Sequence, residues 1–107
     1  MGRMSRQKGK RGEREFAAFL CSLGVEARRG VQFHGGPDSP DVVSSLPVHW
    51  EVKRVERLDL HKSLSQAVDE AAPGKMPVVA HRKNNGEWIA VLNMKDLIPL
   101  IVRAGSQ

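Results

Sequence analysis

Two carboxylates and a lysine, Asp41, Glu51 and Lys53, have the side chains and the spacing of a metal-dependent hydrolytic site. Successive side chains of a strand alternate between its faces, so Glu51 and Lys53 should point the same way. Residues 41–43 are β-prone and residues 44–47 can turn the chain, so a hairpin would place Asp41 beside Glu51. Two adjacent carboxylates repel each other, and Mg²⁺ or Mn²⁺ would relieve that repulsion and activate a water for attack on a phosphodiester. Lys53 would steady this nucleophile or stabilise charge on the phosphate.

Each part of this pattern also has a plain structural explanation. Glu-x-Lys occurs on many exposed strands as a solvated charged face, and Pro-Asp at the start of a strand is often a turn. A second Pro-Asp pair, Pro37-Asp38, stands just upstream, so Asp38 is an alternative to Asp41. We prefer Asp41 because the two valines after it continue directly into a strand, which would fix the carboxylate.

The composition indicates one basic domain with a polyanionic partner. The chain has 107 residues, a usual domain length, and 40% hydrophobic residues, enough for one core. Its 17 Lys and Arg against 12 Asp and Glu give a net charge of +5, which favours nucleic acid as the partner. We find no signal peptide and no apolar run of membrane-spanning length, so we expect no membrane association and a cytoplasmic protein. The single cysteine, Cys21, excludes an internal disulfide, and its apolar helical surroundings predict a buried thiol.

Basic residues gather at the N-terminus and around the predicted hairpin. Residues 1–11 contain no acid, and we expect them to form a flexible basic tail. Such a tail is either a solubilising end or part of a surface that follows phosphates, and basic pairs near the hairpin favour the second interpretation. The candidate DNA-binding residues from this pattern are Lys8, Lys10, Arg11, Arg28, Arg29 and Arg54.

Hydrophobic periodicity predicts alternating helices and strands. Helical spacing of Phe16, Phe19 and Leu20 predicts a helix from about residue 8 to 23, followed by a short strand at 25–28 and the two strands of the hairpin. Asp59 should cap a second helix, whose apolar face comprises Leu60, Leu64, Ala67, Val68 and Ala71.

The C-terminal third is predicted to contain a hairpin and a last helix. The turn Asn84-Asn85-Gly86 should connect strands at 77–81 and 88–92. Asn93 would cap the last helix, which Pro99 should keep short or irregular. The predicted order is α-β-β-β-α-β-β-α, an α/β fold with a mixed sheet flanked by helices in a single domain, 1–107.

The chain resembles the PD-(D/E)xK nucleases, and among them the archaeal-type Holliday junction resolvases and related phage nucleases. Three segments carry the likeness: Lys-Gly-Lys-Arg-Gly-Glu-Arg-Glu-Phe at 8–16, Pro-Asp-Val-Val at 40–43, and Glu-Val-Lys at 51–53. The resemblance implies a restriction-endonuclease-like αβββαβ core and a Mg²⁺- or Mn²⁺-dependent DNA endonuclease. The expected substrate is branched or structured DNA in recombination, repair or phage DNA processing. The resemblance also implies a homodimer in a bacterial, archaeal or phage-infected cell.

The resemblance implies a role for each matched residue of the strands. Asp41 and Glu51 would ligate the metal with help from the Val52 carbonyl, and Lys53 would assist the attacking water. The alternative is a non-catalytic nucleic-acid-binding module on the same fold. Such a module would be marked by a missing carboxylate or lysine, and all of these groups are present.

The helices supply further candidates. Glu13 would complete the metal site, directly or through water, and Arg14 would contact phosphate or brace the site. Helix geometry alone does not select Glu13 over Glu15, because both border the apolar face and either could form surface pairs along the helix. Gln66, on the second helix, would help to hold the nucleophilic water, although exposed glutamines are common.

The sequence leaves the roles of two other groups of residues undecided. The four histidines show no close metal-ligand spacing, so no zinc site is predicted. His49 shares the predicted face of Glu51 and Lys53, where it would line the cleft or be an ordinary strand histidine. The C-terminal residues Leu97, Leu100 and Ile101 are candidates for a dimer interface or for the core.

Overall fold

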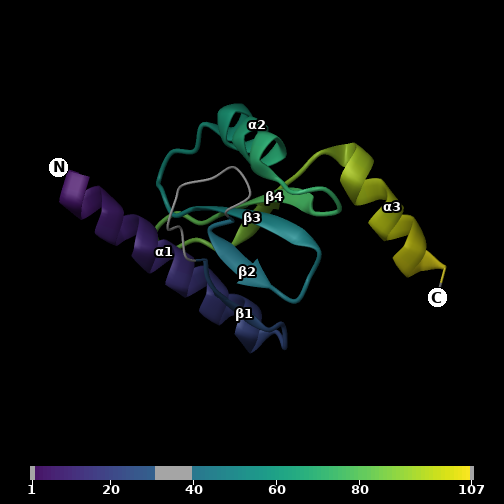
Figure 1. Cartoon of the computed structure of the whole chain (residues 1–107), viewed down its shortest axis with the longest axis horizontal. Coiled ribbons are helices and arrows are strands. Elements are labelled where there is room, and N and C mark those ends of the chain that lie inside the picture. Colours follow the sequence, from purple (N-terminus) through teal and green to yellow (C-terminus); the bar gives the residue numbers. More distant parts are fainter. Residues whose placement is uncertain (1, 31–39, 107) are drawn as a thin grey trace.

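The computed structural model describes the backbone of residues 2–30 and 40–106, with side chains from Gly9 onward. Its elements follow the predicted order (Figure 1): α1 (Gly2–Ser22), β1 (Ala27–Arg29), β2 (Val42–Ser44), β3 (Val48–Lys53), α2 (Leu60–Glu70), β4 (Met76–His81), β5 (Ile89–Val91) and α3 (Met94–Gly105). The alternative acid Asp38 lies outside the described residues. Across the described part of the chain, no helix combines the length and the apolar character needed to cross a membrane.

The strands form one mixed sheet in the order β1-β2-β3-β4-β5. Only the central pair, β3 and β4, is parallel, and α2 provides the crossover that a parallel pair requires. The other neighbours are antiparallel, including β2 and β3, which pair with Val42 opposite Trp50. The predicted turn joins β4 to β5, with Asn85 at a φ of 61° and the Gly86 N–H bonded to the Lys83 carbonyl. The α/β class and the mixed sheet are therefore confirmed.

Helices α1 and α2 cover opposite faces of this sheet (Figure 1). On the α1 side, the Phe16 ring packs 4.9 Å from the ring of Trp50, and it is buried with Leu20 and Val52. Because side chains alternate along β3, His49 and Glu51 point to the other face, where α2 lies. Both of these polar side chains are buried. The fold thus divides β3 into an apolar face and a polar face.

Two helices differ from the sequence prediction in position or rotation. Helix α1 begins at Gly2 rather than near Lys8, so it includes residues that we expected in a basic tail. Asp59 caps α2 as predicted, accepting a hydrogen bond from the Lys62 N–H. Ala67 is buried as predicted, but the second buried residue is Ser63, whereas Leu60 and Val68, expected on the buried face, are 42% and 44% exposed. The helix thus packs against the sheet through the small side chains of Ser63 and Ala67.

The C-terminal helix also differs from the prediction that Pro99 would keep it short or irregular. Helix α3 continues for 12 residues through Pro99, because a proline within a helix removes one backbone hydrogen bond while the others remain available. None of its residues is buried, so Leu100 and Ile101 are not part of the core. Figure 1 shows α3 lying apart from the sheet and the other helices. Cys21, expected to be buried, is exposed at the end of α1, where its thiol donates to the Ala27 carbonyl.

Candidate active site

Pairing of β2 with β3 brings Asp41 to the Glu-x-Lys segment. The Asp41 N–H donates to the Trp50 carbonyl at 3.1 Å, and the Asp41 Oδ2 accepts from the Val52 N–H at 2.8 Å. Val52 stands between Glu51 and Lys53, so this second bond holds the Asp41 carboxylate against the Glu-x-Lys segment. The predicted hairpin therefore places the three charged groups together.

Glu51 and Lys53 share the polar face of β3, as their alternation predicted. The Glu51 side chain is only 4% exposed, and its Oε2 lies 3.9 Å from the Lys53 Nζ. The Lys53 side chain is 30% exposed, so its ammonium group reaches the solvent side of the pair. This arrangement puts a cation at the rim of an acidic site, where an approaching phosphate could meet it.

The electrostatics around Asp41 oppose its ionisation. Burial raises the pKa of Asp41 to about 7, and the negative charge of Glu51 acts in the same direction. The Val52 hydrogen bond lowers this pKa, Glu13 raises it, and Lys53 lowers it, in decreasing order of effect. Two other carboxylates therefore lie close enough to raise the pKa of Asp41. A divalent cation would relieve this repulsion.

Of the two acids of helix α1, Glu13 lies near Asp41, whereas Glu15 pairs with arginines elsewhere. Glu13, whose charge reaches Asp41, accepts a hydrogen bond from Arg29 Nε of β1 at 2.9 Å. Glu15 instead accepts from Arg54 Nε at 3.0 Å and from Arg82, and so ties α1 to the ends of β3 and β4. Burial raises the pKa of Glu15, but the two arginines outweigh burial and lower it overall. The structure thus distinguishes the two acids, which helix geometry could not.

The glutamine candidate lies on the exposed side of α2. Gln66 is exposed, and its Nε2 donates to the Oε1 of Glu70 at 3.3 Å, one helical turn further on. The described bond therefore joins Gln66 to Glu70 rather than to Asp41. A role for Gln66 in holding water stays a prediction.

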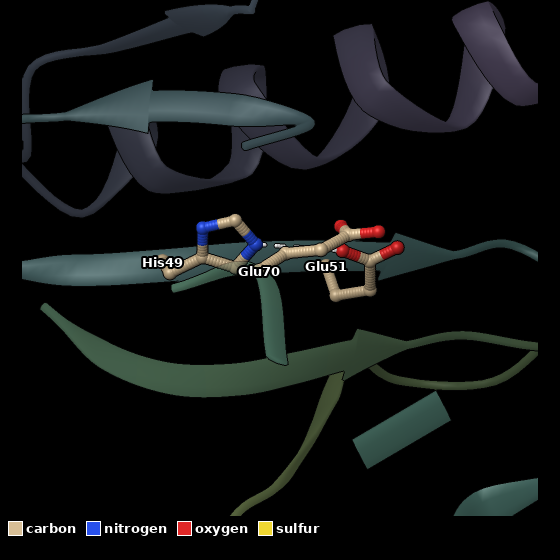
Figure 2. A group of neighbouring side chains, drawn as sticks. All are labelled: His49, Glu51 and Glu70. Carbon is tan, nitrogen blue, oxygen red and sulfur yellow. Dashed lines mark ion pairs between the residues drawn. The ribbon is translucent and has the colours of Figure 1, made fainter. Parts of the chain in front are cut away.

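Glu70 is the residue that sequence analysis missed. The ligand atoms of His49, Glu51 and Glu70 all lie within 4.8 Å of one another, so this group could hold a metal ion. In Figure 2 the His49 ring nitrogen is directed at the Glu51 carboxylate, and the Glu70 carboxylate lies beside it. The sequence pattern that could have identified Glu70 is the spacing of Ser63, Ala67 and Glu70, which places all three on one face of a helix.

The candidate DNA-binding residues divide into exposed and paired groups. Arg29 and Arg54 are held by Glu13 and Glu15, so they also brace the fold. The side chain of Lys8 lies outside the described part of the structure. The exposed members, on α1 and β1, are Lys10, Arg11, Arg14 and Arg28.

Comparisons of the chain with protein-family models, curated proteins and solved structures found no match. The geometry of the site is therefore what indicates its function. The partly buried Asp41 carboxylate bonds to the backbone beside the buried Glu51, Lys53 lies near Glu51, and the charges of Glu51 and Glu13 both reach Asp41. Carboxylates gathered beside a lysine in this way are typical of sites that hold a hard divalent cation.

Proposed function

We propose that the protein is a metal-dependent DNA endonuclease that hydrolyses phosphodiester bonds in branched or structured DNA. The observation that carries the proposal is the hydrogen bond from the Val52 N–H to the Asp41 carboxylate, because it fixes one acid against Glu51 and Lys53. The order α1-β1-β2-β3-α2-β4 supports a restriction-endonuclease-like core. The net charge of +5 supports DNA as the substrate.

The donor set fits Mg²⁺ or Mn²⁺. Asp41 and Glu51 offer the carboxylate oxygens that these ions prefer, and the Val52 carbonyl and Glu13 complete the proposed ligand set. Of the two Glu51 oxygens, Oε2 would ligate this ion, because it lies on the Lys53 side, 3.9 Å from the Lys53 Nζ. When bound, the ion would supply Lewis acidity and lower the pKa of the attacking water.

The other residues of the site would stabilise charge on the phosphate, orient the Glu13 carboxylate and hold the DNA backbone. Lys53 would stabilise the negative charge that grows on the phosphate as the bond to the leaving oxygen breaks. Arg29 would keep the Glu13 carboxylate turned toward the site through their 2.9 Å hydrogen bond. The exposed basic residues of α1 and β1 would hold the DNA backbone on either side of the scissile phosphate.

The proposal is tested by cleavage assays with variants that preserve the fold. Asp41→Asn keeps an oxygen that can accept from the Val52 N–H but removes the charge, and Lys53→Ala removes the ammonium group. We expect both to lower the cleavage rate by roughly 100-fold or more, as loss of one transition-state contact does in other enzymes. The substrates are labelled four-way junction, flap, linear duplex and single-stranded DNA, each with Mg²⁺, Mn²⁺ or EDTA.

The matched control is Asp69→Asn, which removes an exposed carboxylate from α2 away from the Asp41 hydrogen bond. It should cut at the wild-type rate. Cleavage by Asp41→Asn and Lys53→Ala at that same rate would exclude the proposed site. DNA binding by all four proteins without cutting of any substrate would indicate the alternative function, a non-catalytic nucleic-acid-binding module.

A further inference from the structure

The polar face of β3 contains two buried atoms whose hydrogen bonds are missing. The side chains of His49 and Glu51 are 2% and 4% exposed, respectively. Among the described residues, neither the His49 Nε2 nor the Glu51 Oε1 has a hydrogen-bond partner. Buried polar groups in proteins are nearly always hydrogen-bonded, because an unsatisfied group in the interior is destabilising, so an interaction with a further group is expected.

The distance between these two atoms matches a pair of metal ligands. The His49 Nε2 and the Glu51 Oε1 are 3.5 Å apart, which is long for a hydrogen bond between them. Two donors bound about 2.1 Å from one ion in a tetrahedral arrangement lie about 3.4 Å from each other. A Glu70 carboxylate oxygen lies within 4.8 Å of a ring nitrogen of His49 and of a carboxylate oxygen of Glu51, so it could become the third ligand after a small side-chain movement.

We propose that His49, Glu51 and Glu70 form a second cation site, selective for a divalent transition metal such as Zn²⁺. The imidazole nitrogen sets this site apart from the Asp41 site, because nitrogen donors favour Zn²⁺ over Mg²⁺, whereas an all-oxygen set favours Mg²⁺. Glu70 is only half-buried, so the site opens toward solvent beside α2. Three protein ligands leave a position for water or for an oxygen of a bound phosphate.

Glu51 connects the two sites. Its Oε2 faces the Lys53 ammonium group and its Oε1 faces His49, so one carboxylate could contribute to both. Gln66 would act as a positioning residue, because its hydrogen bond to Glu70 restrains that carboxylate. The second site does not depend on nuclease activity, because its ligands are defined by their own geometry.

Zinc binding by the purified, metal-free chain tests the proposal. Isothermal titration calorimetry with Zn²⁺ alone would compare the wild type with Glu70→Gln, which keeps the side-chain volume and an acceptor oxygen but loses the charge. We expect the affinity for one Zn²⁺ ion to fall at least about tenfold, since even the loss of an outer partner of a metal ligand has this effect. Asp69→Asn, the neighbouring exposed acid of α2, should bind as the wild type does.

The position of the zinc ion in a crystal distinguishes binding at this site from adventitious binding at other side chains. In crystals grown with Zn²⁺, anomalous scattering should place an ion about 2.0–2.1 Å from the His49 Nε2. His49→Asn should abolish that peak, with circular dichroism used to establish that the variant is folded. Crystals without a zinc ion at His49, or equal affinity of the wild type and Glu70→Gln, would overturn the proposal.

The two proposals fail separately. Asp41→Asn removes a ligand of the Mg²⁺ site only, so we expect it to lose DNA cleavage and to keep zinc binding at His49. Zinc at His49 in a wild type that cuts no DNA would support the second cation site and count against the nuclease. DNA cleavage by a wild type that holds no zinc at His49 would support the nuclease and count against the second cation site.

Discussion

Asp41 is fixed by a backbone hydrogen bond in a place where burial and two other acids oppose its charge. Its pKa is about 7 in the folded protein, against an ordinary value of 3.8. Between these two pH values the folded protein retains a proton that the unfolded chain has released. The free energy of unfolding must therefore fall as the pH rises through this window, and the loss is complete above the folded pKa.

This residue yields a pH-dependent prediction. In EDTA, the wild type should lose a few kcal/mol of unfolding free energy between about pH 4 and about pH 8 relative to Asp41→Asn, which cannot ionise at this position. Urea denaturation at several pH values measures the difference. Excess Mg²⁺ should reduce it, because a cation favours the ionised carboxylate. Parallel pH profiles of the two proteins in EDTA would show that Asp41 titrates normally.

At the scale of elements, α1 crosses the end of β3 at very close range. A Cβ added at Gly12 would lie 2.6 Å from the Arg54 Cβ, a contact that requires the backbones to move apart. Arg54 in turn bonds to Glu15, so the close approach and the ion pair hold the same part of α1. The position of α1 matters because this helix also supplies Glu13 to the site.

Gly9 and Gly12 of α1 should respond in opposite ways to substitution by alanine. Gly12→Ala should destabilise the protein by about 1–3 kcal/mol, the usual effect of forcing an extra group into a packed region. Gly9→Ala should stabilise it by roughly 0.5–1 kcal/mol, because a Cβ at Gly9 has nothing within 4 Å and alanine is the better helix former. Thermal or urea unfolding measures both changes. Equal effects of the two substitutions would contradict the close contact with Arg54.

On the scale of the whole molecule, α3 differs from the two other described helices, because both of those contribute buried residues. It has no buried residue, and Met94, Ile98 and Ile101 recur along it at helical spacing with 65%, 44% and 55% of their surfaces exposed. An isolated helix of 12 residues is marginal in water, so α3 needs a packing partner to be stable. A second copy of the chain is the partner that the resemblance to resolvases implies, since two sites would then cut two strands.

We therefore predict a homodimer that depends on α3. Ile98→Glu combined with Ile101→Glu should place two charges in the interface and shift the wild-type dimer to a monomer in light scattering at micromolar concentration. Leu23→Glu, at a residue that is 65% exposed at the end of α1, is the control and should leave the dimer intact. A wild type that is monomeric both with and without DNA would contradict the prediction.

Local patterns in the sequence were enough to predict the order of the elements and the approach of Asp41 to Glu51. Asp59 caps α2, and Asn84-Asn85-Gly86 turns β4 into β5, because capping and turn hydrogen bonds involve neighbouring residues only. The hairpin of β2 and β3 likewise closes over a few residues. Its strand alternation then determines which side chains share the face of Glu51.

Only the tertiary structure decided what depends on packing between distant segments. The sequence could not distinguish Glu13 from Glu15, because their roles follow from where Arg29, Arg54 and Asp41 meet α1. It predicted that Ala67 would be buried, but it did not predict that the buried face of α2 is rotated toward Ser63 and away from Leu60 and Val68. That rotation brings Glu70 to His49, a residue 21 positions earlier on another element (70 − 49 = 21). Periodicity identifies the faces of an element, whereas the choice of the face that packs inward depends on the shape and charge of its neighbours.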